Sequence, residues 1–129
     1  MNCLSETALA FARECMGWED AMAINDFGHP YIMRESARRL APIPGARKHF
    51  FNPTDLNAVM DVAQNWCLSQ QPKLCADVGF NCTAKESTFD AFIRDPDGEI
   101  IANTAFKDSA AHALIAVCLD AARQLKGAA

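Results

Sequence analysis

The chain has 129 residues, half of them apolar, with a formal net charge of −4 and an isoelectric point of about 5.2. This length and composition predict one domain, residues 1–129, with a sizeable hydrophobic core, and they exclude a disordered protein. The acidic balance argues against long nucleic acid or an anionic membrane surface as a partner. No apolar run reaches the roughly 18 residues of a membrane span. Charged residues also interrupt the first helix, where a signal peptide would be unbroken, so we expect a cytoplasmic protein.

The first predicted helix has Ser5 as its N-cap and ends near Gly17. Apolar residues between these positions recur with the spacing of one helical face. Trp18 follows directly after the expected end of the helix.

Residues 19–51 are predicted to form an irregular insert, because prolines and a glycine interrupt any regular pattern. Two short elements could form within it, a strand at Met22–Phe27 and a weakly helical segment at Tyr31–Leu40. The stretch 29–49 holds one acid and five basic residues, which are Arg34, Arg38, Arg39, Arg47 and Lys48. Its charge is therefore +4, and the rest of the chain carries −8.

This cationic segment on an acidic body suits a small anion, such as a short phosphorylated ligand, better than a long polyanion. The alternative interpretation is a solvated loop whose arginines pair with the acidic surface.

The second helix is predicted by Asn52 as its cap, Pro53 at the first helical position and Asp55 in the first turn. An unbroken apolar stripe follows at helical spacing, formed by Leu56, Val59, Met60, Ala63, Trp66 and Cys67. From Leu74 the apolar period changes to two, which predicts strands over Leu74–Cys82, Phe89–Arg94 and Glu99–Phe106. A Pro-Asp-Gly turn at 96–98 joins the last two strands into an antiparallel meander.

The last predicted helix is capped by Asp108 or Ser109 and is apolar over most of its surface. Such a helix is buried on more than one side, either deep in the domain or against a partner subunit. The order of elements predicts an α+β fold, with an antiparallel β-sheet meander carrying helices on both faces as an α/β/α sandwich.

No motif in the chain indicates catalysis, so we predict no catalytic residues and no enzyme activity. His29, His49 and His112 fall in no recognisable arrangement with a nucleophile, and His112 is expected at the surface. The six cysteines show no C-x-x-C spacing, so we predict no metal site and no cofactor. Cys15, Cys67 and Cys118 fall on apolar helix stripes and are expected to be buried free thiols.

Binding chemistry is better represented on the second predicted strand. Phe92 and Arg94 share its more polar face, and Asn103 can lie beside them across the hairpin. A ring, a guanidinium and an amide suit a nucleotide, through stacking, charge and hydrogen bonds. The alternative is that Phe92 packs under a second layer of helices.

Three runs of the sequence resemble the phage ABA-sandwich domain family. They are Glu14-Cys15-Met16-Gly17-Trp18 at the end of the first helix, residues 51–62 at the start of the second, and the alanine-rich residues 109–119 of the last. The insert is longer and more basic than in that family, and Val59 or a neighbour replaces its usual tryptophan in the second helix.

The family includes phage anti-Thoeris proteins, which are anti-defence sponges. The resemblance implies an oligomer that sequesters a cyclic ADP-ribose isomer, and in some members cyclic oligonucleotides, without chemistry. It implies that an aromatic residue, Phe89 or Phe92, and Asn103 contact the ligand, while arginines such as Arg34 and Arg38 bind its phosphates. Trp18 belongs to the family signature, although its default role is packing.

Two other functions stay open at this point. One is an enzyme that cleaves or modifies a nucleotide. The other is a phage structural or interaction module whose assembly is its whole function.

Overall fold

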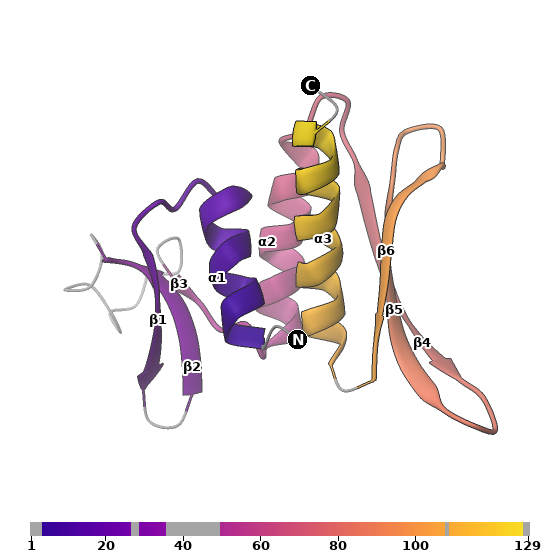
Figure 1. Ribbon diagram of the computed structural model, residues 1–129, viewed down its shortest axis with the longest axis horizontal. Coiled ribbons are helices and arrows are strands. Elements are labelled where there is room, and N and C mark those ends of the chain that lie inside the picture. The colour runs from indigo at the N-terminus through magenta and orange to yellow at the C-terminus, as the bar shows by residue number, and fades with distance from the viewer. Residues whose placement is uncertain (1–3, 27–28, 36–49, 108, 128–129) are drawn as a thin grey trace.

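The computed structural model describes residues 4–26, 29–35, 50–107 and 109–127, and within these ranges the chain forms three helices and six strands (Figure 1). In chain order the elements are α1 (Leu4–Glu14), β1 (Ala21–Asp26), β2 (His29–Arg34), β3 (Phe50–Phe51), α2 (Leu56–Leu68), β4 (Cys75–Cys82), β5 (Ser87–Arg94), β6 (Ile100–Phe106) and α3 (Ala110–Gly127). The strands form two antiparallel sheets, in the orders β1-β2-β3 and β4-β5-β6.

The three helices form a middle layer between the two sheets (Figure 1). The predicted α+β class and the antiparallel meander are therefore confirmed, but the order of the layers differs from the prediction. Among the described residues, helices cover one face of the β4-β5-β6 sheet and not both. On β5 the buried Ala91 and Ile93 face that layer, while Phe92 and Arg94 alternate onto the opposite face and stay partly exposed.

The prediction of irregular structure over residues 19–51 is largely wrong for the first half of that range. Residues 21–26 and 29–34 pair as an antiparallel hairpin, with Ala21 opposite Arg34 and Ile24 opposite Tyr31. The short strand expected near Met22–Phe27 is thus confirmed as β1, whereas the helical segment expected from Tyr31 is a strand as far as Arg34. Residues 36–49 lie outside the described residues, and with them Arg38 and the other basic residues of the insert beyond Arg34.

The start of α2 lies later than predicted. The carboxylate of Asp55 accepts a hydrogen bond from the Asn57 backbone N–H at 3.0 Å, so Asp55 is the N-cap. Asn52 instead closes the preceding turn, where its side-chain oxygen accepts from the Thr54 N–H and hydroxyl. At the other end, the Ser69 hydroxyl donates to the Trp66 carbonyl at 2.6 Å.

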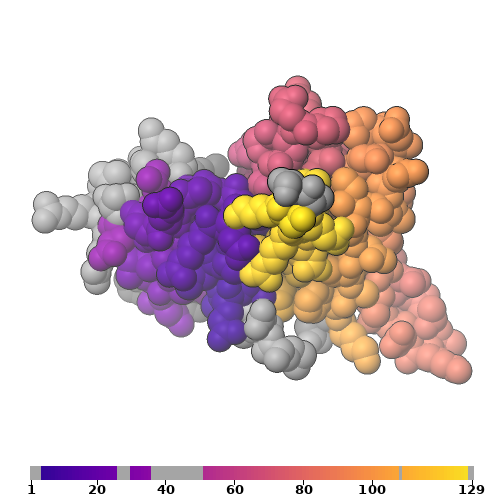
Figure 2. All heavy atoms as spheres, turned by 45° about the horizontal axis from the view of Figure 1, so that its top comes forward, coloured from indigo at the N-terminus to yellow at the C-terminus, as the bar shows by residue number. Residues whose placement is uncertain are grey.

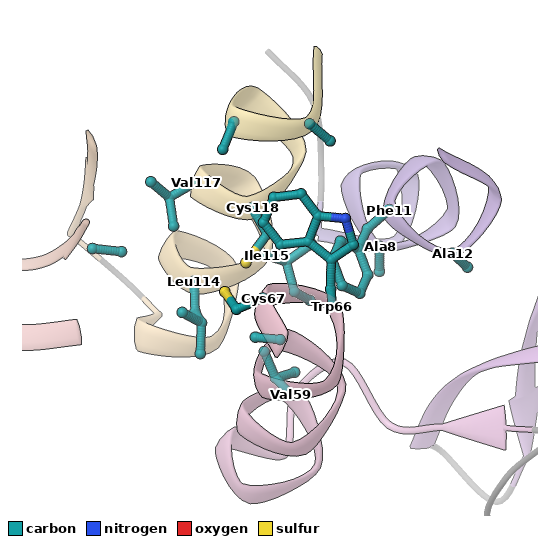
Figure 3. Packing of buried hydrophobic residues seen from close by; sticks show 14 of the residues in the cluster. Ala8, Phe11, Ala12, Val59, Trp66, Cys67, Leu114, Ile115, Val117 and Cys118 are labelled. Carbon is teal, nitrogen blue, oxygen red and sulfur yellow. The ribbon is translucent and has the colours of Figure 1, made fainter. Parts of the chain in front are cut away.

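α3 is the central element of the core, as its all-round apolar pattern predicts. Nine of its residues are buried, and it contacts α1, α2 and all three strands β4, β5 and β6. Figure 3 shows Ile115 beside Phe11 of α1 and Trp66 of α2. The sulfurs of Cys67 and Cys118 point toward each other across the α2–α3 contact (Figure 3), and both cysteines are free.

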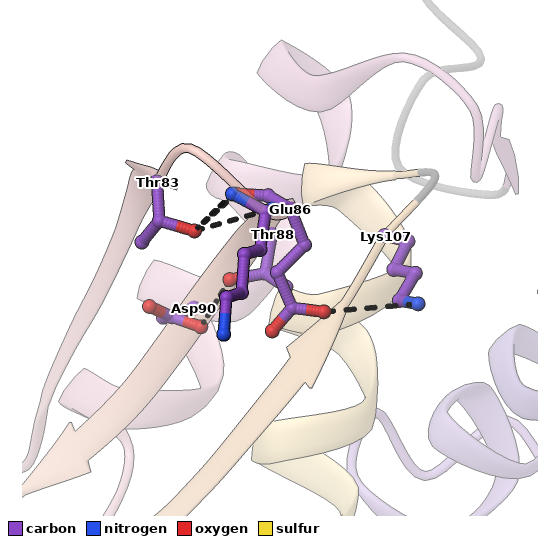
Figure 4. A network of polar contacts seen from close by, with 6 residues as sticks. Thr83, Glu86, Thr88, Asp90 and Lys107 are labelled. Carbon is purple, nitrogen blue, oxygen red and sulfur yellow. Dashed lines mark hydrogen bonds and ion pairs between the residues drawn. The ribbon is translucent and has the colours of Figure 1, made fainter.

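The far end of the β4–β5 hairpin projects beyond the helices, as Figures 1 and 2 both show. Its turn is held by Thr83, whose hydroxyl accepts from the backbone N–H groups of Lys85 and Glu86 (Figure 4). Glu86 also pairs with Lys107 of the neighbouring chain segment at 3.8 Å. The turn is therefore stabilised by its own hydrogen bonds and by an ion pair to the segment that follows β6.

Candidate functional site

A cavity of about 790 Å³ lies between the end of α1, the β2–β3 strands and the outward face of α2. This volume falls within the range of small-molecule sites in proteins. Four aromatic residues contribute to its lining, which are Trp18, Tyr31, Phe51 and Trp66. Both tryptophans of the chain are among them.

The aromatic side of the cavity is positioned by the end of α1. Gly17 adopts a positive φ of 72°, which a glycine reaches without strain, and the Trp18 N–H donates to the Ala12 carbonyl at 3.0 Å. The indole then lies against Phe51, with ring centroids 6.1 Å apart at an angle of 55°. Trp18 is 8% exposed and Phe51 5% exposed, so both rings belong to the core and also border the cavity.

The polar side of the cavity is a ladder on α2, formed by Asn57, Asp61 and Asn65 at intervals of four residues. Residues four apart lie above one another on the same helical face. We call these three residues the α2 wall. The small Ala58 and the half-buried Val62 lie beside them and also line the cavity, so the polar groups are not covered by larger neighbours.

Asp61 is exposed, and its carboxylate has no hydrogen bond or ion pair among the described residues. Asp55 also lines the cavity, but its carboxylate is engaged as the cap of α2. It occupies the place at the helix N-terminus where an anion would otherwise bind. The described lining thus carries two carboxylates and no cationic side chain. Near α2 it favours hydrogen-bond donors and disfavours phosphate.

Cys15 is the one thiol in the described lining, and burial raises its pKa to about 12. The thiol is therefore protonated at neutral pH, and a protonated thiol is a poor nucleophile. Two nearby cations, Lys126 and Arg123, do not line the cavity, and each lowers this pKa by less than burial raises it.

The structure brings three of the predicted site residues together, but outside the cavity. Phe92 lies opposite Asn103 on one side and Asp77 on the other, and the Arg94 guanidinium carbon is 5.5 Å from the Phe92 ring centroid. We call this surface, Asp77, Phe92, Arg94 and Asn103, the open sheet face. The expectation that Phe92 packs under helices is wrong, because the helical layer lies on the other side of the sheet.

The remaining predicted residues are dispersed. Phe89 alternates onto the helix-facing side of β5, where its ring centroid is 5.3 Å from that of Phe80. Arg34 lies on β2 and pairs with Asp20 at 3.6 Å, and its Nε is buried without a hydrogen bond among the described residues. Trp18 lines the cavity, and Arg38 lies outside the described residues. The described members of the predicted set are therefore not gathered in the cavity, which contains only Trp18 among them.

His112 was expected at the surface, but it is half-buried on α3, between α1 and the end of β6. Its Nε2 lies 3.2 Å from the Thr7 hydroxyl of α1, and its ring stacks on Phe106 with centroids 4.2 Å apart. Burial lowers the pKa of this histidine, so the neutral form is favoured.

Sequence reasoning missed Tyr31, Phe51 and the α2 wall. A signal for the wall is present in the sequence, because Asn57, Asp61 and Asn65 repeat at the helical period on the polar side of the second predicted helix. Tyr31 and Phe51 carry no such signal, because the prolines and the glycine of residues 19–51 predict irregular structure.

Comparison of the chain with models of protein families, with curated protein sequences and with solved structures gave no match. The resemblance to the phage ABA-sandwich family thus stays a prediction. Within the described ranges, no helix combines the length and apolar character needed to cross a membrane. Those ranges also contain no group of three or more histidine, cysteine and acidic residues arranged to hold a metal ion.

Proposed function

We propose that this chain is a non-catalytic binding protein that sequesters a cyclic nucleotide signal in the host cytosol, as phage anti-defence sponges do. The observation that carries the proposal is the 790 Å³ cavity, which combines aromatic rings with unengaged amide and carboxylate groups. The flat base of a nucleotide can lie against the aromatic rings, and its edges can form hydrogen bonds with the amide and carboxylate groups. The protonated Cys15 thiol favours binding over chemistry on the ligand.

The charge distribution around the cavity favours one orientation of such a ligand. Its base would lie toward α2, because the carboxylates there repel phosphate. Its phosphates would lie away from α2, with Arg34 and Arg38 as the proposed contacts. In the sequence both arginines lie between Tyr31 of β2 and Phe51 of β3, which line the cavity.

Self-association is part of the proposal, as a dimer or a higher oligomer. The open sheet face supports it, because Phe92 is only partly covered and the neighbouring Ile100 is 50% exposed. Light scattering on the purified protein measures the subunit number directly.

The test of binding is a thermal-shift screen against cyclic dinucleotides, cyclic trinucleotides and cyclic ADP-ribose isomers. A ligand at 100 times its dissociation constant stabilises the folded state by about 2.7 kcal/mol. Because both tryptophans border the cavity, the same ligand should also change tryptophan fluorescence. The bound ligand is then released by heating and analysed by chromatography. Intact ligand supports a sponge, product indicates an enzyme, and no shift with any compound overturns the proposal.

A further inference from the structure

We infer that the α2 wall recognises the hydrogen-bonding edge of a guanine base, so that guanine-containing cyclic nucleotides are the preferred ligands. This inference rests on the proposed function and names the ligand class of the same cavity.

The first step is the hydrogen-bonding capacity of Asp61. An ionised carboxylate only accepts hydrogen bonds, and the carboxylate of Asp61 has no partner among the described residues. A group that presents two adjacent N–H donors engages both carboxylate oxygens at once. The Watson–Crick edge of guanine does so, through the ring N1–H and the exocyclic N2 amino group. The corresponding edge of adenine presents one amino donor and a ring nitrogen whose lone pair the carboxylate repels.

The second step is the position of the amides. Asn57 and Asn65 lie one helical turn on either side of Asp61, with Cβ atoms about 5–6 Å from those of their neighbours. A side-chain amide can donate to the remaining group on the guanine edge, the O6 carbonyl. The α2 wall thus offers an amide N–H donor beside the two carboxylate oxygens of Asp61. This order matches the guanine edge, where the O6 carbonyl is followed by the N1–H and the N2 amino group.

The third step is the opposite side of the cavity. Trp18, Tyr31 and Phe51 supply aromatic surface against which a purine ring can lie. Asp55 does not compete for the base, because its carboxylate is held by the Asn57 N–H. Nor does any cation in the described lining neutralise Asp61. One free carboxylate therefore decides between the two purines.

The test compares cyclic di-GMP with cyclic di-AMP and with cyclic di-inosine monophosphate, which lacks the N2 amino group. A hydrogen bond to a charged group contributes enough to expect cyclic di-GMP to bind at least about tenfold more tightly than either. Asp61→Asn should reduce this preference to less than about threefold. Asp120→Asn, an exposed acid on α3 that does not line the cavity, is the matched control and should leave the ratio unchanged.

The outcomes separate the two proposals. If no cyclic nucleotide binds, the proposed function and this inference both fail. If cyclic nucleotides bind but the wild-type protein does not distinguish the three compounds, the guanine inference is overturned while the sponge stands. The same holds if Asp61→Asn keeps the tenfold preference. The comparison on the wild-type protein does not depend on how well any variant folds.

Discussion

The cavity beside α2 and the open sheet face contain similar residue types, but they differ in shape and in which groups are free. On the open sheet face Arg94 donates to Asp77 at 3.2 Å and lies over the Phe92 ring, so its charge and the ring are already engaged with each other. In the cavity the Asp61 carboxylate is unengaged among the described residues, and four aromatic residues line the same hollow.

The difference shows that residue type alone does not locate a binding site. A ring, a guanidinium and an amide on a flat sheet satisfy one another and stay open to water, which weakens any charged contact. A concave surface removes water from the ligand and leaves its polar groups free to select it.

The largest difference is expected when one aromatic ring is removed from each region. Trp18→Ala should lower the free energy of unfolding by about 3–5 kcal/mol, because the indole is 8% exposed and packs on Phe51. Phe92→Ala should cost less than about 1.5 kcal/mol, since its ring is only partly buried. Urea denaturation measures both. Equal costs would mean that the open sheet face is covered in solution, as an oligomer interface would cover it.

Filling each region with a large side chain tests which one binds the ligand. Ala58→Trp places an indole in the cavity and should weaken cyclic nucleotide binding by roughly 100-fold, about 2.7 kcal/mol. Ala105→Trp adds the same side chain beside Asp90 on the outer side of the β4-β5-β6 sheet, and should leave affinity within about twofold. Isothermal titration calorimetry gives both affinities. The reverse result would move the site to the sheet.

The elements with strong periodicity were predictable from the sequence, and the cavity was not. The alternating pattern of β5 placed Phe92 and Arg94 on one face, and the apolar surface of α3 indicated its central position. Both predictions depend on the spacing of apolar residues within one strand or one helix, which the sequence gives directly. A cavity instead depends on how distant segments meet, here Trp18, Tyr31 and the α2 wall.

The hairpin β1–β2 shows why the insert was misjudged. A proline at position 30 predicts a break in regular structure, but Pro30 lies near the start of β2, opposite Asn25. β3 pairs with β2 only at Ile32 and Met33, so in the described structure Pro30 has no neighbouring strand on that side and its missing N–H is tolerated. A short partner strand of two residues could not be predicted from the sequence pattern.

A smaller effect is expected from His112, which lies between the helical layer and β6. Burial lowers the pKa of this histidine in the folded state, so the unfolded state binds more protons between the two pKa values. Stability should therefore be full above about pH 6.5 and decrease as the pH falls, by at most about 1.4 kcal/mol per pH unit. His112→Asn should flatten the dependence of the urea midpoint between pH 7 and pH 5. An unchanged slope would assign the dependence to other groups.

The smallest effect is expected on the open sheet face itself. Arg94→Ala removes a side chain that pairs with Asp77, an acid that is 61% exposed, so it should cost less than about 0.5 kcal/mol of stability. It should also leave cyclic nucleotide affinity within about twofold, because the helical layer separates this face from the cavity. A tenfold loss of affinity, with the fold intact by circular dichroism, would contradict this comparison. A flat surface would then bind the ligand, and only a second subunit seated on that surface could enclose it there.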